Sequence, residues 1–197
     1  MKKLIVLLLL VLGSRADAQE STQLRAIIHS RFFVSGEMKP NPSGVFLVNW
    51  SIVNIMSDIP NNGNVLLGIG YAGRNWAIEN MVQRQWSSFG NALFLDWRFT
   101  AKPTKRIGIY IEMAPRINKK TFYDFATVDV QVLGPFSIGF ETENVHRVGK
   151  DTLGLGPRVV LPLPSSWFFK PTVIVSRQLR TLGPNITRLY TVFNSTF

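Results

Sequence analysis

Hydrophobic and polar residues alternate with a period of two along most of this chain, beginning near residue 44. The clearest example is the segment 91–101, where one face carries Leu93, Leu95, Trp97 and Phe99. The other face carries Ala92, Phe94, Asp96, Arg98 and Thr100. Successive side chains of a β-strand point to opposite faces of the sheet, so this alternation predicts a strand with one apolar and one largely polar face.

Ten such segments follow one another, separated by short stretches rich in Gly, Pro, Asn, Ser and Lys. They cover residues 45–56, 63–73, 75–86, 91–101, 105–117, 121–133, 135–146, 151–163, 167–180 and 185–197. No segment with a helical period lies between them, which favours an antiparallel up-and-down meander over a fold with crossover helices. We therefore expect an all-β fold, an antiparallel up-and-down β-barrel of about ten strands, with eight or twelve as alternatives.

Residues 19–43 are ambiguous. The stretch QLRAIIHSRFFVSG, which begins at Gln23, fits either an alternating strand or an amphipathic helix that caps or plugs one end of the barrel. Counting it as a strand would give eleven, whereas bacterial single-chain barrels have an even number of strands. We therefore expect the barrel to comprise residues 44–197, with residues 19–43 as an N-terminal extension and a first strand as the alternative.

The beginning of the chain has the pattern of a secretory signal peptide. Lys2 and Lys3 precede an apolar run over residues 4–12, and Ala16, Asp17 and Ala18 form an A-x-A cleavage site. The apolar run is too short to span a bilayer, and no later stretch is long enough for a transmembrane helix. We expect residues 1–18 to be removed on export.

The two faces of the strands indicate which one is outside. A soluble barrel of lipocalin type would hide its apolar face and bind a hydrophobic ligand there, whereas a membrane barrel turns that face to lipid. Here the polar face combines glycines with charges of both signs, which suits a crowded lumen. The apolar face carries aromatic residues, several near strand ends as in a membrane girdle: Trp50, Tyr71, Trp76, Trp97 and Trp167. We favour a transmembrane barrel, and the soluble ligand-binding barrel is the alternative.

Charged residues on the polar face predict a network inside the barrel. Alternation assigns to it Asp96, Arg98, Arg106, Glu112, Arg116, Asp129, Glu141, Glu143, Arg158, Lys170 and Arg180. Opposite charges from neighbouring strands would pair, because a buried unpaired charge is costly to desolvate. The alternative is a water-filled pore whose basic lining favours anions. Barrels of about ten strands lie between those filled by side chains and those with an aqueous channel, so we expect slow or no conduction.

The net charge of +10 at pH 7 lies largely in predicted turns, such as the one with Lys102, Lys105 and Arg106. These turns either attract anionic lipid head groups and lipopolysaccharide phosphates or are solvated residues without a partner. Nucleic acid is not an expected partner, because none of the usual binding motifs is present. The chain has no cysteine, which excludes disulfides, thiol nucleophiles and thiolate metal sites.

The two histidines raise the question of catalysis, since some outer-membrane barrels are lipid hydrolases. His146 is close in sequence to Glu141 and Glu143, but alternation places it on the opposite face, and no adjacent serine forms a recognisable motif. His29 lies in the ambiguous N-terminal segment. No phosphate-binding loop or metal-binding pattern is present. We expect a monomer without catalytic residues, cofactor or metal, and a membrane hydrolase is the less favoured alternative.

The last predicted strand, RLYTVFNSTF, carries Leu189, Phe193 and Phe197 on one face, although Thr191 and Ser195 share that face. This pattern resembles the terminal aromatic β-signal of Gram-negative outer-membrane β-barrel proteins. The resemblance implies location in the outer membrane and recognition by the machinery that inserts such barrels. The resulting expectation is a small outer-membrane barrel with a structural, adhesive or weak passive-transport role.

Overall fold

The fold was analysed in a computed structural model of the chain, which describes all residues except 1–19, 38–41, 57–62, 88–89, 118 and 165–169. The expected signal peptide, residues 1–18, and Trp167 therefore lie outside the described residues.

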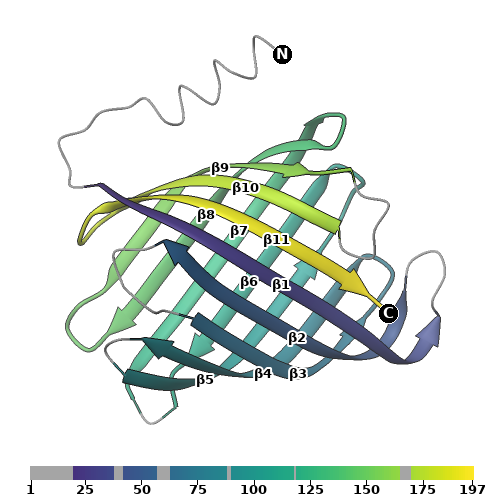
Figure 1. Ribbon diagram of the computed structural model, residues 1–197, viewed down its shortest axis with the longest axis horizontal. Helices are drawn as coiled ribbons and strands as arrows, with labels where there is room; N and C mark the ends of the chain where they lie inside the picture. Colours follow the sequence, from purple (N-terminus) through teal and green to yellow (C-terminus); the bar gives the residue numbers. More distant parts are fainter. Residues whose placement is uncertain (1–19, 38–41, 57–62, 88–89, 118, 165–169) are drawn as a thin grey trace.

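The described residues form eleven β-strands that close into one barrel (Figure 1). The strands are β1 (Glu20–Glu37), β2 (Ser43–Met56), β3 (Gly63–Ala72), β4 (Trp76–Ser87), β5 (Gly90–Ala101), β6 (Ile107–Pro115), β7 (Thr121–Leu133), β8 (Phe136–Arg147), β9 (Thr152–Pro162), β10 (Lys170–Arg180) and β11 (Asn185–Thr196). All ten predicted segments are strands, with ends that differ from the predicted ones by three residues or fewer. The all-β barrel is thus confirmed.

The strand count differs from the prediction because residues 20–37 form β1 instead of an extension outside the barrel. β1 pairs with β2 on one side and with β11 on the other. The pairing of β1 with β2 is antiparallel, as is every other pairing of consecutive strands, but β1 and β11 are parallel. The expectation of about ten strands, all antiparallel, is therefore not met, and the alternative in which residues 19–43 contribute a first strand is the one that the structure shows.

The parallel pairing of β1 and β11 is a consequence of the odd number of strands. Strand directions alternate along a meander, so the first and last of eleven strands run the same way. They can close the barrel only through a parallel ladder, which here runs from Glu20 opposite Asn185 to Arg31 opposite Thr196. We call this β1–β11 pairing the seam. The start of β1 and the end of β11 consequently lie at opposite ends of the barrel (Figure 1).

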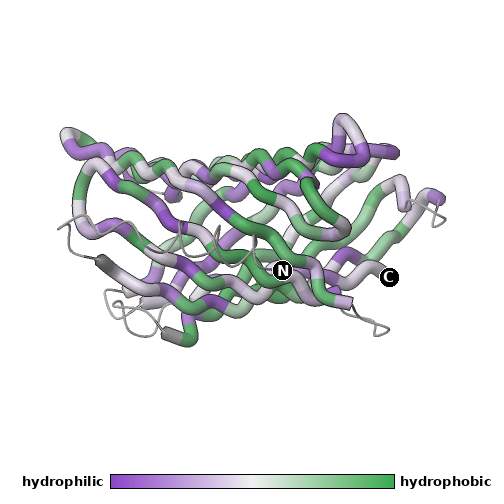
Figure 2. Tube along the Cα trace, turned by 90° about the horizontal axis from the view of Figure 1, so that it is seen from above, coloured by the Kyte–Doolittle hydropathy of each residue, from purple (hydrophilic) through white to green (hydrophobic). Residues whose placement is uncertain are grey.

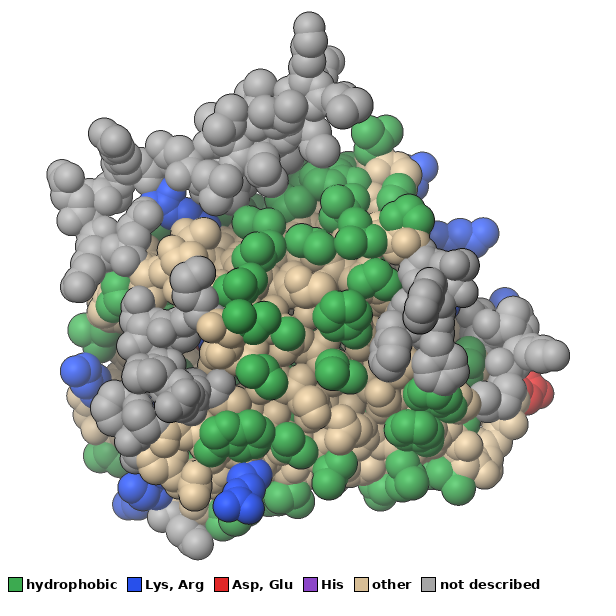
Figure 3. Space-filling view, in the orientation of Figure 1, with side chains coloured by type: hydrophobic (Ala, Val, Ile, Leu, Met, Phe, Trp, Pro, Cys, Tyr) green, Lys and Arg blue, Asp and Glu red, His purple; other side chains and the backbone are tan. Residues whose placement is uncertain are grey.

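Side chains of opposite character occupy the two faces of the wall. Colouring by hydropathy shows hydrophobic and hydrophilic positions alternating along the strands (Figure 2). The outer face that contains β1, β2 and β11 carries many hydrophobic side chains, with lysines and arginines towards its edges (Figure 3). No described helix is long and apolar enough to cross a membrane.

Part of the interior is apolar. Six buried side chains from β2, β3 and β4 pack together there, namely Phe46, Val48, Leu66, Ala72, Ala77 and Met81. Both faces of β2 are therefore largely hydrophobic, since Val45, Leu47 and Val53 on its outer face are exposed. The remaining interior positions are mainly polar or charged, and they form the site described next.

Candidate functional site

The barrel interior holds charged side chains that are almost completely buried. Glu79 on β4 is 1% exposed, and Asp96 on β5 is 0% exposed. Alternation points these residues inward, while their sequence neighbours point outward. A buried charge requires a partner, and polar residues of neighbouring and facing strands provide the partners here.

The first group, which we call the Glu79 cluster, consists of His29, Arg31, Trp50 and Glu79. Arg31 donates to Glu79 Oε1 from Nε at 2.8 Å and from Nη2 at 2.6 Å. His29 Nε2 lies 3.2 Å from the same oxygen, and the Trp50 indole donates to Oε2 at 2.8 Å. The carboxylate of β4 is thereby held by two side chains of β1 and one of β2.

Trp50 was predicted in the outward aromatic girdle, and this is wrong. Its ring lies inside the barrel, stacked on the His29 ring with centroids 3.9 Å apart. The guanidinium carbon of Arg98 lies 4.2 Å from the centroid of the Trp50 ring, within the range of a cation–π interaction. Trp50 therefore joins the Glu79 cluster to the charges of β5.

Arg98 on β5 bridges two carboxylates. Its Nε donates to Asp96 at 2.8 Å, and its Nη2 lies 3.3 Å from Glu112 Oε1 on β6. The Tyr110 hydroxyl donates to the other oxygen of Glu112 at 2.8 Å. The predicted pairing of Asp96, Arg98 and Glu112 inside the barrel is thus present.

The second group is centred on Glu141 of β8, and we call it the Glu141 cluster. Ser176 and Gln178 of β10 donate to Glu141 Oε1 at 2.7 and 2.9 Å. Arg158 of β9 and Arg188 of β11 each place a guanidinium nitrogen 3.5 Å from the carboxylate. Ser176 and Gln178 are 0% exposed, so water contributes little to the solvation of this carboxylate.

Two further carboxylates belong to the Glu141 cluster. Arg188 pairs with Glu143 of β8 and also donates to Gln23 of β1 at 3.1 Å. Arg158 Nε lies 3.0 Å from Asp129 of β7. The cluster thus joins six strands of the barrel wall, including both strands of the seam.

These contacts reach across the interior as well as along the wall. Arg31 and Glu79 belong to strands separated by two others, and so do Arg188 and Glu141. The interior ion pairs involve four arginines, Arg31, Arg98, Arg158 and Arg188, and six carboxylates, Glu79, Asp96, Glu112, Asp129, Glu141 and Glu143. Chemically, this arrangement crosslinks the wall and fills the space between facing strands.

Four residues predicted for this network lie at its margins or outside it. Arg106 is exposed and precedes β6, and Lys170 is exposed at the start of β10, so their prediction as members of the buried network is wrong. Arg116 follows β6 and lines a hollow at the rim, and Arg180 is half-buried at the end of β10. Strand ends lie at the barrel openings, where alternation no longer determines burial.

The interior residues that sequence reasoning missed are His29, Arg31, Glu79 and Arg188. His29 and Arg31 lie on β1, which was expected outside the barrel. Glu79 and Arg188 alternate in step with the inward-facing residues of their strands, so the alternation pattern alone would have identified them as interior residues.

The outward aromatic residues are only partly those predicted. Tyr71 and Trp76 pack together at the β3–β4 turn with ring centroids 5.7 Å apart, and Trp97 is 38% exposed on β5. Trp86, which was not predicted, is also exposed on the outer face.

The residues of the predicted β-signal face outward from β11, and the last of them forms part of the seam. The Phe197 ring stacks on Phe32 with centroids 4.6 Å apart. The Phe197 backbone nitrogen donates to Arg31 O, and its oxygen accepts from Phe33 N, both at 2.9 Å. Leu189 is 40% exposed, and Phe193 lies opposite Ile28 of β1.

His146 lies on the outer face, as its alternation predicts, in a polar group near the end of β8. Its Nε2 is 2.8 Å from Asp124 and its Nδ1 is 3.5 Å from Asp151. Asn144 also donates to Asp124 at 2.7 Å. Both described polar contacts of the His146 ring nitrogens are thus with carboxylates, and the ring also packs on Phe122 with centroids 5.7 Å apart. No three described His, Asp or Glu side chains are arranged to hold a metal ion.

No protein-family model matches the chain, and comparison with curated proteins and with solved structures finds no match.

Proposed function

We propose that this protein is an integral β-barrel of a bacterial outer membrane, with a structural or adhesive role and an interior closed by paired charges. The observation that carries the proposal is the reversed burial of the two faces. Asp96 is 0% and Arg98 2% exposed, whereas Leu67 and Ile69 are each 59% exposed. In water, charged side chains are almost always outside and large aliphatic ones inside. The reversed arrangement suits a wall that faces lipid.

The magnitude of this reversal supports a lipid environment. Burying one large apolar side chain contributes about 1.5–3 kcal/mol. About ten half-exposed side chains would therefore forgo roughly 10 kcal/mol in water, which is comparable with the entire stability of a domain. The exposed hydrophobic residues include Leu47, Leu67, Ile69, Phe140 and Leu155. Contact with acyl chains removes this cost.

Strand length is consistent with the proposal. The described strands contain between 9 and 18 residues, and a tilted transmembrane strand needs about 9–11. The apolar run and A-x-A site at residues 1–18 support export, and the pattern of Leu189, Phe193 and Phe197 supports assembly by the outer-membrane insertion machinery.

The interior favours a closed lumen over the two alternatives. A soluble ligand-binding barrel would need its apolar face inside, and a pore would need an open path. Instead, Arg31 with Glu79 and Arg188 with Glu141 span the space between non-adjacent strands. Six carboxylates take part in the described interior ion pairs, so the lining is not uniformly basic. We propose that passive transport through this barrel is weak or absent.

Tryptophan quenching by brominated lipid tests membrane insertion directly. The chain has five tryptophans, and two variants would each retain one of them, Trp97 or Trp50, with the others changed to phenylalanine. We expect brominated acyl chains to quench Trp97 and to leave Trp50 at its intensity in unbrominated lipid. Equal quenching of both, or a protein that stays soluble without detergent and shows no heat-modifiable gel migration, would refute the proposal.

Planar-bilayer recording tests the closed interior separately. We expect the inserted wild-type barrel to give no stepwise porin-like conductance. Large, regular conductance steps from a preparation that shows heat-modifiable migration would establish a pore and overturn this part of the proposal while leaving membrane insertion intact.

A further inference from the structure

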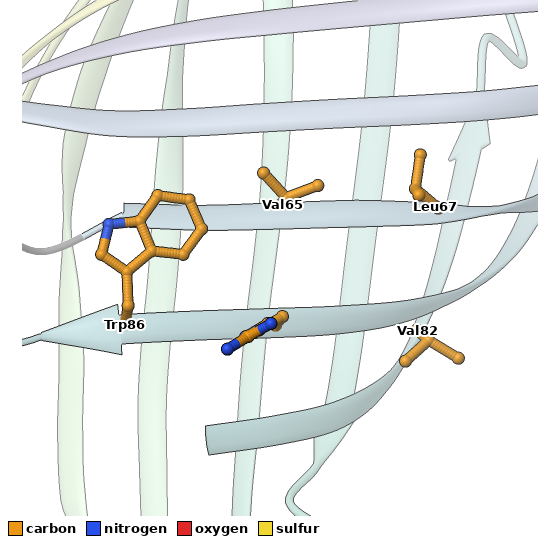
Figure 4. A pocket seen from close by; sticks show the side chains of 5 residues that line it. Val65, Leu67, Val82 and Trp86 are labelled. Atoms are coloured by element: carbon orange, nitrogen blue, oxygen red, sulfur yellow. The ribbon is translucent and has the colours of Figure 1, made fainter. Parts of the chain in front are cut away.

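Two hollows adjoin on the outer surface near one end of the barrel. The first is lined by Val65 and Leu67 of β3 and by Val82, Arg84 and Trp86 of β4, and Figure 4 labels its four apolar residues. The second lies towards β5 and the segment after β6, and Arg84 lines it too. Because Arg84 belongs to both, the two hollows form one continuous surface, which we call the Arg84 groove.

The first part of the groove is apolar. Leu67 is 59%, Val82 51% and Trp86 37% exposed, so these side chains are available to a ligand from outside. The Trp86 ring packs over Gly63, where an added Cβ would lie 2.6 Å from the ring carbon Cζ2. Glycine at this position therefore lets the indole lie close against β3 and form one end of the hollow.

The second part of the groove is cationic. Arg84, Arg116 and Lys119 line it together with the apolar side chains of Leu93 and Ile117. None of the described lining residues is acidic, and none of the three cations has an ion pair with a described carboxylate. By contrast, the arginines of the interior ion pairs are all matched with carboxylates.

The groove lies where a lipid head group would be. β4 ends at Ser87 and β6 at Pro115, and these strands run in the same direction, so Arg84, Arg116 and Lys119 lie near the same end of the barrel. Arg84 is exposed and sits between the outward-facing Val82 and Trp86. A guanidinium on a lipid-facing wall is costly unless it reaches the interface or meets an anion there.

We propose that the Arg84 groove binds an anionic membrane phospholipid. Its phosphate lies among Arg84, Arg116 and Lys119, and an acyl chain lies along Val65, Leu67, Val82 and Trp86. A zwitterionic lipid fits less well, because its ammonium group would meet three cations and no described carboxylate. This inference rests on the proposed membrane location, since an acyl chain enters the groove from a bilayer.

Lipid titration of the full-length barrel in detergent micelles tests the inference. Native mass spectrometry would count bound dioleoyl phosphatidylglycerol, and dioleoyl phosphatidylcholine would serve as the neutral lipid with the same chains. The variant Arg84→Gln/Lys119→Gln removes two cations of the groove. The control Arg147→Gln/Lys150→Gln removes two exposed cations of the β8–β9 turn at the same barrel end. Heat-modifiable migration verifies that each variant is folded.

We expect the wild type and the control to retain phosphatidylglycerol in preference to phosphatidylcholine, and the groove variant to bind it about tenfold more weakly. Equal retention of the two lipids, equal loss in both variants, or displacement of the lipid by millimolar inorganic phosphate would overturn the inference. If the barrel migrates as folded and brominated lipid quenches its tryptophan fluorescence, but it shows no lipid preference, only the proposal of lipid binding in the groove is refuted. A chain that remains soluble without detergent would refute the membrane proposal itself.

Discussion

Replacing Glu79 with alanine is expected to destabilise the barrel strongly, because this carboxylate organises three other side chains. The Glu79 side chain is only 2% exposed and accepts hydrogen bonds from Nε and Nη2 of Arg31 and from the Trp50 indole, and His29 Nε2 lies 3.2 Å from it. Its removal leaves a guanidinium and an indole N–H without their acceptor. Breaking a buried ion pair on one side costs about 3–5 kcal/mol, and an unpaired buried donor about 1–3 kcal/mol. Since Arg31 is partly exposed, we expect about 3–4 kcal/mol for Glu79→Ala.

Urea unfolding of the barrel in lipid vesicles, followed by heat-modifiable migration, measures this cost. At an unchanged slope, the shift in midpoint gives the change in free energy of unfolding. Glu79→Gln keeps an acceptor but removes the charge, so an intermediate loss is expected. The control Glu37→Ala changes an exposed glutamate at the end of β1 and should cost less than about 0.5 kcal/mol.

A double-mutant cycle completes the test. If the pair is coupled as the distances indicate, Arg31→Ala/Glu79→Ala will cost less than the sum of the single variants by at least about 1 kcal/mol. A Glu79→Ala barrel that unfolds at the wild-type midpoint, or single-variant costs that simply add, would refute the assignment of Glu79 as the centre of a buried network.

Two further predictions concern the seam and the packing of the wall. Phe197→Asp should impair assembly of the exported chain in the outer membrane, measured as heat-modifiable protein in membrane fractions, because it removes an aromatic residue of the proposed β-signal. Phe32→Ala removes only the stacking partner of Phe197, worth about 0.5–1.5 kcal/mol, so normal assembly of Phe32→Ala beside defective Phe197→Asp separates recognition from seam stability. Gly156→Ala should prevent folding in detergent, because the added methyl group would collide with the Arg177 backbone oxygen, whereas Gly108→Ala should fold normally, with nothing within 4 Å of its Cβ. Equal folding yields for the two glycine variants would contradict this packing.

Alternation was sufficient to predict ten strands because most of them have one clearly polar and one clearly apolar face. It failed for β1, where Ile27 and Ile28, and then Phe32 and Phe33, are consecutive hydrophobic residues that occupy both faces. A strand with this pattern is difficult to distinguish from an amphipathic helix. Bacterial barrels usually have an even number of strands, and this preference then argued against counting residues 20–37 as a strand. The alternation of residues in one sequence does not show that the first and last strands pair in parallel.

The same physical limit explains the errors in the site. Trp50 belongs to β2, whose two faces are both largely hydrophobic, so its residue type did not indicate its direction. Arg106 and Lys170 lie at the openings of the barrel, where an inward position is still solvated. Asp96, Arg98 and Glu112 were correctly placed because they lie well inside strands with clear alternation. Which carboxylate meets which arginine depends on contacts across several strands, and these are invisible in one sequence.

The charge network and the odd strand number are connected through the seam. Parallel ladders are slightly less stable per residue than antiparallel ones, and this barrel closes through its one parallel pair. His29 of β1 contacts Glu79 and also lies 3.0 Å from Asn194 of β11, while Arg188 of β11 reaches both Gln23 of β1 and the Glu141 cluster. Each cluster thus ties the seam to strands on the other side of the interior. We therefore expect loss of the Glu79 carboxylate to increase amide hydrogen exchange in β1 more than in β6. The side chains of β1 lose their contacts with Glu79, whereas β6 pairs with antiparallel strands on both sides.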